Sequence, residues 1–209
     1  GTLEAVEAAR YGRVPGDLKF EDTNNDGKIE LLTDGDVIGH AYPKFYGGFN
    51  NNFTYKNFDA NIDIMFVGGV DKAIVHESAE DRQFVNGMMN SVLDGWRPDH
   101  QETMIAQVRA GNAGARYDSY PDTHMIWNAA YIRGQTASVG YTFRGNLGGI
   151  DRLRVYATAD NFFLLTAVEL PGYDTEGSSI QQINVRVPNI DKYMHPVPTT
   201  FSFGVNVTF

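Results

Sequence analysis

The last eleven residues, 199–209 (TTFSFGVNVTF), constrain the fold of this 209-residue chain more than any other segment. Apolar side chains occupy every second position and small or polar ones lie between, the apolar set being Phe201, Phe203, Val205, Val207 and Phe209. A β-strand places successive side chains on opposite faces, so one face is apolar and the other polar. This alternation is typical of the closing strand of an outer-membrane β-barrel. A half-buried strand of a soluble β-sandwich fits it equally well, so the rest of the chain has to decide.

Four earlier segments alternate in the same way and are predicted as strands, namely residues 43–56, 58–70, 128–143 and 152–165. A two-residue turn, Lys56-Asn57, joins the first two into a β-hairpin. A glycine-rich turn at 144–151 joins the second two, whereas long segments, 71–127 and 166–198, make the other connections. In an up-and-down meander, all long loops would lie at one end of the strands and all short turns at the other. Outer-membrane barrels show that asymmetry, and a soluble sandwich has no reason for it.

Five strands are too few to close a membrane barrel, because the smallest single-chain barrels have about eight. An open sheet edge in lipid would leave backbone groups unpaired. We therefore expect the chain to be the C-terminal part of a larger barrel, or to pair with another chain. The predicted fold class is all-β, a transmembrane antiparallel β-barrel with long extracellular loops. One loop contains a short predicted helix, because Phe84, Met88 and Val92 recur at helical spacing between a capping-box-like start at Ser78 and a stop at Gly95.

Composition excludes several classes of function. The net charge of -9 argues against nucleic acid as a partner. The absence of cysteine excludes a thiolate metal site and disulfide bonds. The mean hydropathy is -0.33 and no run of about eighteen apolar residues predicts a transmembrane helix, although barrel strands also keep the average low. The five histidines are scattered and no hydrolase motif is present, so we predict that the chain is not an enzyme.

Residues 22–30 (DTNNDGKIE) match the calcium-binding loop of an EF-hand. Such a loop supplies oxygen ligands at alternate positions and a glycine at the sixth, where the chain turns sharply. The candidate ligands are the side chains of Asp22, Asn24, Asp26 and Glu30 and the carbonyl of Lys28. The twelfth position is Thr33 instead of the usual bidentate acid, and Asp34 or Asp36 could replace it in a longer loop. An Asn/Asp-rich turn without metal is the alternative.

A series of motifs, in the right order and spacing, resembles the C-terminal third of SusC/RagA-family TonB-dependent transporters. The motifs are residues 15–20 (PGDLKF), the acidic loop, 46–49 (YGGF), 52–59 (NFTYKNFD), 95–98 (GWRP), 130–133 (AYIR), 139–141 (VGY), 154–156 (RVY), 160–162 (DNF) and 172–174 (GYD). The resemblance implies a plugged barrel of about twenty-two strands, with this chain supplying the last five. Residues 1–42 would then form an extracellular loop carrying the calcium motif, and residues 43–209 the barrel strands and their loops.

The resemblance also implies a function. Such proteins import oligosaccharides or peptides across the bacterial outer membrane, work with a SusD-like surface lipoprotein, and receive energy from TonB through an N-terminal part with the plug. Aromatic loop residues are candidates to face the solute or the lipoprotein lid. They are Trp96, Tyr117, Tyr120, Trp127 and Tyr173. Packing within the loops or at the membrane interface is the alternative for each. The competing class for the whole chain is a soluble calcium-dependent carbohydrate-binding or adhesion β-sandwich.

Overall fold

The computed structural model describes residues 4–30, 32–74, 93–107, 122–145, 148–170, 172, 174–176, 189–191 and 194–209. The chain divides into two compact units. The loop unit comprises Gly1–Ile38 and Ile74–Ile126, and the sheet unit comprises Gly39–Ala73 and Trp127–Phe209. Among the described residues, no helix is both long enough and apolar enough to cross a membrane. The helix predicted between Ser78 and Gly95 lies almost entirely outside the described residues.

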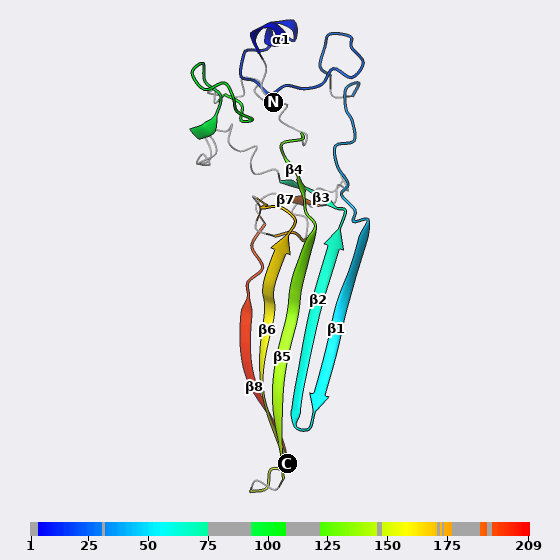
Figure 1. Ribbon diagram of the computed structural model, residues 1–209, viewed down its shortest axis with the longest axis vertical. Helices are drawn as coiled ribbons and strands as arrows, with labels where there is room; N and C mark the ends of the chain where they lie inside the picture. The colour runs from blue at the N-terminus through cyan, green and yellow to red at the C-terminus, as the bar shows by residue number, and fades with distance from the viewer. Residues whose placement is uncertain are drawn as a thin grey trace. The chain divides into compact units, whose positions relative to one another are not determined.

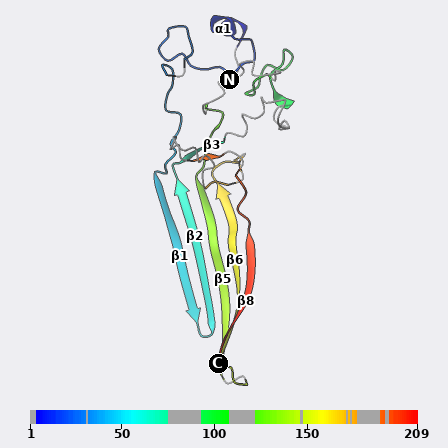
Figure 2. The same cartoon turned by 180° about the vertical axis from the view of Figure 1, so that it is seen from behind.

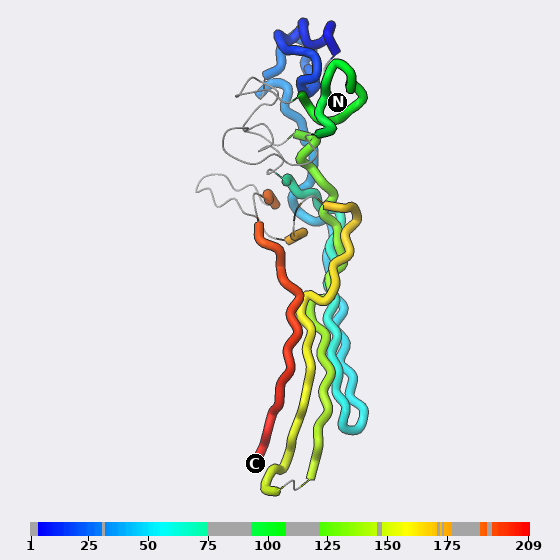
Figure 3. Tube along the Cα trace, turned by 90° about the vertical axis from the view of Figure 1, so that its left-hand side faces the viewer, coloured from blue at the N-terminus to red at the C-terminus, as the bar shows by residue number. Residues whose placement is uncertain are grey.

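The sheet unit is built on a five-stranded antiparallel sheet with the strand order β1-β2-β5-β6-β8 (Figures 1 and 2). Its strands are β1 (Phe45–Tyr55), β2 (Phe58–Gly68), β5 (Tyr131–Arg144), β6 (Arg152–Thr166) and β8 (Thr200–Thr208). Figure 3 shows them as extended traces running alongside one another. All five strands predicted from alternation are therefore confirmed, and they follow one another across the sheet as a meander.

The register of the sheet keeps like residues together on each face. One row, which runs across all five strands, consists of Phe53, Ala60, Val139, Ala157 and Phe203. The adjacent row, on the opposite face, consists of Asn52, Asn61, Ser138, Thr158 and Ser202. A shift of the pairing by one residue would mix the two sets, so the alternation of each strand specifies its register. The sheet consequently has one apolar face and one polar face.

The apolar face is exposed. Phe203 is 85% exposed and Phe53 is 59% exposed, and no large apolar side chain of this face in the described residues is buried. The buried apolar residues of the sheet unit lie instead near the start of β5 and in the short strands beside it. They are Val70, Ala73, Ala129, Tyr131 and Ile190. The wide sheet therefore has no hydrophobic core of its own on the side where its apolar residues point.

Short and long connections fall at opposite ends of the sheet, as predicted. Lys56 takes a left-handed φ of 55° in the tight turn between β1 and β2. The Asp151 N–H donates to the Thr208 carbonyl (2.9 Å), which fixes the end of the chain beside the short connection between β5 and β6. The long connections, from β2 to β5 and from β6 to β8, leave from the other end (Figure 1).

The predicted loops contain short elements that the sequence did not indicate. A second sheet has the order β4-β3-β7 and is built from β3 (Asp71–Ile74), β4 (Ile126–Asn128) and β7 (Ile190–Asp191). The treatment of residues 71–127 and 166–198 as loops without strands was wrong at these positions. Strands of two to four residues are too short to show alternation, and pairing between distant segments forms them. The loop unit begins with one helical turn and a half, α1 (Ala5–Arg10).

Candidate functional site

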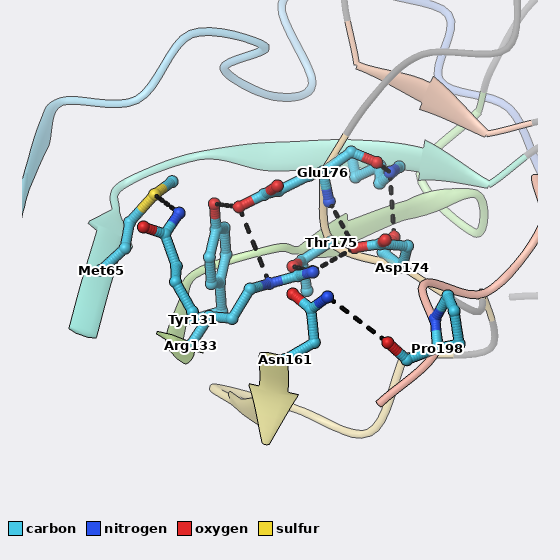
Figure 4. Close-up of polar contacts among 10 residues, drawn as sticks. Met65, Tyr131, Arg133, Asn161, Asp174, Thr175, Glu176 and Pro198 are labelled. Atoms are coloured by element: carbon cyan, nitrogen blue, oxygen red, sulfur yellow. Dashed lines mark hydrogen bonds and ion pairs between the residues drawn. The ribbon is translucent and has the colours of Figure 1, made fainter. Parts of the chain in front are cut away.

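A buried cluster of charged side chains lies where β5 begins (Figure 4). Lys72 comes from β3, and Tyr131 and Arg133 share the polar face of β5 because they are two residues apart. Together they hold residues 174–176, a segment of the long connection between β6 and β8. We call this arrangement the clamp. It was missed at the level of sequence, where residues 130–133 and 172–174 served only as family motifs.

Lys72 and Arg133 grip the segment in different ways. The Lys72 ammonium donates to the carbonyl oxygens of Asp174 (3.0 Å) and Glu176 (3.1 Å). The Arg133 guanidinium donates to the Asp174 carboxylate and, at 3.5 Å, to the Thr175 hydroxyl. Its Nε lies 3.7 Å from the Glu176 carboxylate. Backbone and side chains of the segment are thus held together by two cations.

Tyr131 completes the clamp through its hydroxyl, which donates to the Glu176 carboxylate. The Asp174 carboxylate also accepts from the Glu176 N–H (3.0 Å), which closes a local turn. Tyr131 and Arg133 are 6% and 4% exposed and Asp174 is 4% exposed, so the contact between Arg133 and Asp174 is made out of water, whereas the Glu176 side chain is 38% exposed. Hydrogen bonds to charged groups in such surroundings are stronger than neutral ones.

Burial and neighbouring charges act in opposite directions on Lys72 in the clamp. Lys72 is wholly buried, and this burial lowers the pKa of its ammonium, while the carboxylates of Asp191 and then of Asp174 and Glu176 act in the opposite direction. One Asp191 oxygen accepts from the Met194 N–H (3.0 Å). Within the described residues, the other Asp191 oxygen and the Nε of Arg133 have no hydrogen-bond partner. The clamp can bind and position a chain segment, but it presents no nucleophile paired with a base.

The predicted calcium loop folds into a turn stabilised by its own side chains. Asp22 accepts from the N–H groups of Asp26 (3.1 Å) and Gly27 (2.9 Å), and Asn24 accepts from the Asp26 N–H (2.8 Å). Asp26 in turn accepts from the Lys28 N–H (2.8 Å). Gly27, at the sixth position, has a φ of +85°, a conformation that favours glycine. The structure therefore brings together the first three predicted ligands and the sharp turn.

Asp34 joins the two ends of this loop. Its carboxylate accepts from the N–H groups of Thr23 (3.1 Å) and Glu30 (2.7 Å), and the bond from Glu30 is the main reason why the pKa of Asp34 is lowered. Glu30 thus takes part through its backbone, and the Asp36 carboxylate accepts from the Val37 N–H (2.6 Å). In the part of the chain that the structure describes, no three acidic or histidine side chains are grouped closely enough to hold a metal ion.

The predicted solute-facing aromatics are only partly described. Tyr117, Tyr120 and Tyr173 lie outside the described residues. In the loop unit, the Trp96 ring lies against Gly16, where an added Cβ would be 2.4 Å from the ring. In the sheet unit, Trp127 belongs to β4, and its indole nitrogen is buried without a partner among the described residues. Both indoles are half-buried, and contact with a solute remains a prediction for them.

A second ion pair crosses the polar face near the short turns. The Arg154 Nε on β6 donates to the Asp59 carboxylate on β2 (3.0 Å), across the intervening strand β5 at Gly140. The guanidinium lies over the Tyr156 ring, 4.7 Å from its centre. A Cβ on Gly140 would come within 2.6 Å of the guanidinium, so a larger residue at this position would displace the Arg154 side chain from the pair.

Comparison with known proteins gives relatives over nearly the whole chain, although no family model matches it. TonB-dependent receptor P3 of Formosa agariphila is 30% identical over 208 residues, which cover 93% of this chain and 19% of the relative. TonB-dependent receptor P26 of the same organism is 27% identical over 216 residues, which cover 99% of this chain and 21% of the relative. TonB-dependent receptor SusC of Bacteroides thetaiotaomicron is 25% identical over 209 residues, which cover 93% of this chain and 18% of the relative.

Solved structures show the same fold. The RagAB peptide importer in its open-open state matches with a TM-score of 0.65 at 18% identity, over 93% of this chain and 20% of the solved one. The RagAB peptide transporter matches with a TM-score of 0.66, over 88% and 19%. The chain spans about a fifth of the length of each of these proteins. The names of the sequence relatives describe TonB-dependent receptors, and together with the motifs they confirm the resemblance of this chain to the SusC/RagA family of TonB-dependent receptors, which are outer-membrane proteins.

Proposed function

We propose that this chain is the C-terminal wall of an outer-membrane importer for large nutrients. The observation that carries the proposal is the exposed apolar face of the five-stranded sheet, with Phe203 85% exposed in the middle of the last strand. A soluble sandwich would cover such a face with a second sheet. Lipid covers it in a barrel, while the polar face lines the lumen.

The two edges of the sheet support the same proposal. Among the described strands, β1 and β8 each pair on one side only. Unpaired edges are excluded from lipid, so both have to continue into further strands. A barrel of about twenty-two strands around a plug, as in the large outer-membrane transporters, would supply them. The remainder of the barrel, its plug and a segment that contacts TonB would lie in other parts of the protein.

The relatives support a proposal for the substrate class and the lid. RagAB is described as a peptide importer, and SusC is described as a TonB-dependent receptor. We propose that the present protein takes up oligosaccharides or peptides and works with a SusD-like surface lipoprotein. The long connections of the sheet unit would meet the solute at the extracellular mouth.

We also propose that residues 22–34 bind calcium. The turn at Gly27 and the inward side chains of Asp22, Asn24 and Asp26 fit the first half of an EF-hand loop. Calcium would have to compete with the Arg10 guanidinium, which lies 3.7 Å from the Asp22 carboxylate. It would also have to draw Asp34 or Glu30 from their present hydrogen bonds. Terbium luminescence of the full-length protein, compared with that of Asp26→Asn, tests this site.

The decisive experiment for the importer proposal is purification of the native protein from its membrane. A polypeptide about five times the mass of this chain, extracted by detergent together with a surface lipoprotein, is the expected result. A polypeptide of this size that stays monomeric in buffer without detergent would refute the proposal and favour the soluble calcium-dependent sandwich.

A further inference from the structure

We propose that Arg144 and Arg152 form an anion-binding site that holds acidic side chains of the plug against the polar face of the sheet. The inference rests on the proposed import function, because that function places a plug inside the barrel. It gives the polar face a partner of stated chemistry at the end with the short turns. Four observations lead to it, all within the sheet unit.

The first observation is that two arginines lie directly opposite each other. The register pairs Arg144, at the end of β5, with Arg152, at the start of β6 (Figure 1). Arg144 is an even number of residues from Ser138, and Arg152 is an even number from Thr158, so alternation places both on the polar face. Both are exposed. We call them the arginine pair. Like charges directly opposite on neighbouring strands destabilise a sheet unless an anion compensates them.

The second observation is that the neighbouring carboxylate is already taken. Arg154, in the adjacent row, donates to both oxygens of Asp59. Among the described residues, neither member of the arginine pair forms an ion pair or a side-chain hydrogen bond, and Asp151 forms no ion pair. The connection also contains residues 146 and 147 outside the described ranges, which are asparagine and leucine and carry no charge. The positive charge of the pair therefore has no compensating partner in this part of the sheet.

The third observation limits the direction from which a partner can come. Arg144 extends past the end of β2, because Phe58, the first residue of β2, pairs with Tyr141. On the other side lie β6 and β8, so any further strand would be three strand spacings away, about 14 Å. An arginine side chain does not span that distance. A partner of Arg144 therefore approaches over the polar face, which is the side that the plug occupies in the proposed barrel.

The fourth observation is that a second layer can approach the polar face closely at this end. The Tyr156 ring lies over Gly204 of β8, where an added Cβ would be 2.3 Å from the ring. The Arg154 guanidinium similarly lies over Gly140 of β5. These large side chains lie along the sheet because the glycines leave room for them. Carboxylates suit the arginine pair, because guanidinium groups bind them through two parallel hydrogen bonds.

The first experiment uses the full-length transporter and measures two quantities. Hydrogen exchange followed by mass spectrometry reports how firmly the plug is held, and the heat-dependent gel shift reports unfolding of the barrel. The test variant is Arg144→Gln/Arg152→Gln. The matched control is Lys56→Gln, which removes a cation at the same end of the sheet, in the turn between β1 and β2. The Lys56 ammonium lies over the Tyr55 ring, 5.2 Å from its centre.

Loss of the arginine pair should loosen the plug. Exchange in at least one segment of the plug should rise at least about tenfold in the double variant, because charge-assisted contacts are lost. Lys56→Gln should leave it unchanged. Raised salt should also speed this exchange in the parent protein but not in the double variant, since salt screens exposed charges.

An arginine pair without a partner predicts the opposite sign. Neutralising either arginine would then relieve repulsion, so the barrel would unfold at a higher temperature while exchange in the plug stays unchanged. That result would overturn the inference. Binding to lipid phosphates gives another pattern. In vesicles of phosphatidylcholine with and without phosphatidylglycerol, the anionic lipid would then stabilise the parent but not the double variant, again without a change in the plug. This pattern would overturn the inference as well.

A cross-linking experiment tests the contact directly and does not depend on the double variant folding. Arg152→Lys keeps the charge and supplies an amine, which a carbodiimide joins to a touching carboxylate as an amide with loss of water. A cross-link from position 152 to an aspartate or glutamate of the plug is the expected result. No cross-link to the plug, or one to a barrel strand alone, would overturn the inference. A native polypeptide without a plug would overturn the import function too, whereas negative results with the plug present would overturn this inference alone.

Discussion

The substitution Phe203→Arg tests most directly whether lipid covers the apolar face. β8 has nine residues, which span about 30 Å along the strand and about 23 Å across a membrane at the usual barrel tilt. Phe203 is the fourth of them, so its 85% exposed side chain would lie close to the middle of the apolar band. An arginine on the lipid face at that depth costs about 2–4 kcal/mol.

Two variants on the same strand serve as controls for this cost. Ser202→Arg places the same charge on the polar face, one residue away, and should cost less than about 0.5 kcal/mol as an ordinary surface change. Val207→Arg places it on the apolar face but near the end of the strand, where the cost falls to about 0–1 kcal/mol. A difference of 2–4 kcal/mol corresponds to about 30- to 900-fold in the folding equilibrium. The expected order of cost is therefore Phe203 first, then Val207, then Ser202.

The assay is reversible urea unfolding of the full-length protein in lipid vesicles, followed by the heat-dependent gel shift of folded barrels. Equal costs for Phe203→Arg and Val207→Arg would refute the membrane interpretation, because burial against a second protein layer shows no such dependence on depth. Equal costs for Phe203→Arg and Ser202→Arg would refute the assignment of faces. Expression levels should be lowest for Phe203→Arg and highest for Ser202→Arg, because the insertion of the barrel meets the same energetic cost.

Three further predictions follow from single contacts. Arg154→Met should lower the free energy of unfolding by about 1 kcal/mol in the same assay. Gly140→Ala should lower it by the same amount, because the new Cβ would displace the same guanidinium. The double variant should therefore cost no more than either single variant. Acidification should release the acidic loop, because the pKa of Asp34 is lowered in the folded protein. The stabilisation by Asp34 is complete above the ordinary carboxyl pKa of 3.8 and is lost as the pH falls from there through the lowered pKa. Amide exchange at the two N–H groups that donate to Asp34 would show this loss. Gly16→Ala should move the Trp96 ring away and shift its fluorescence to longer wavelength. The added methyl group would clash with the ring, and the backbone at this position has a φ of +88°, which disfavours alanine. An unchanged emission spectrum would contradict the packing of Trp96 on Gly16.

The five long strands were predictable because each one carries its own pattern. In β2, for example, Phe58, Ala60 and Ile62 alternate with polar residues, and β5 shows the same period at Val139 and Tyr141. The pattern fixes the face of each residue, and the short turns fix which strands are neighbours. The bounds of the strands differ from the predicted ones by only a few residues, since pairing decides where each strand stops.

The clamp was not predictable by the same means. Lys72 lies 102 residues before Asp174, and Arg133 lies 41 residues before it. No local period links such residues, and each is an ordinary charged position when considered alone. The signal that could have found them is a charged residue at the start of a strand, Arg133, followed by an acidic pair in the next long loop. The short strands of the β4-β3-β7 sheet, which carry Lys72 and Asp191, were missed for the same reason.

The two faces of the sheet unit place different demands on stability, and this difference supports an importer over a soluble sandwich. The apolar face leaves Phe53 and Phe203 exposed, so it gains nothing from folding in water and needs lipid to stabilise it. The strongest interactions of the polar face are instead charge pairs. The partly exposed Arg154–Asp59 pair lies near the short turns, and the buried clamp lies at the opposite end of the sheet. A soluble sandwich would place its core between two sheets and its charges outside. Here the apolar groups share one exposed face, while the two described charge pairs lie on the other face, and the one at the end with the long loops is buried. That arrangement suits a wall with lipid on one side and water on the other.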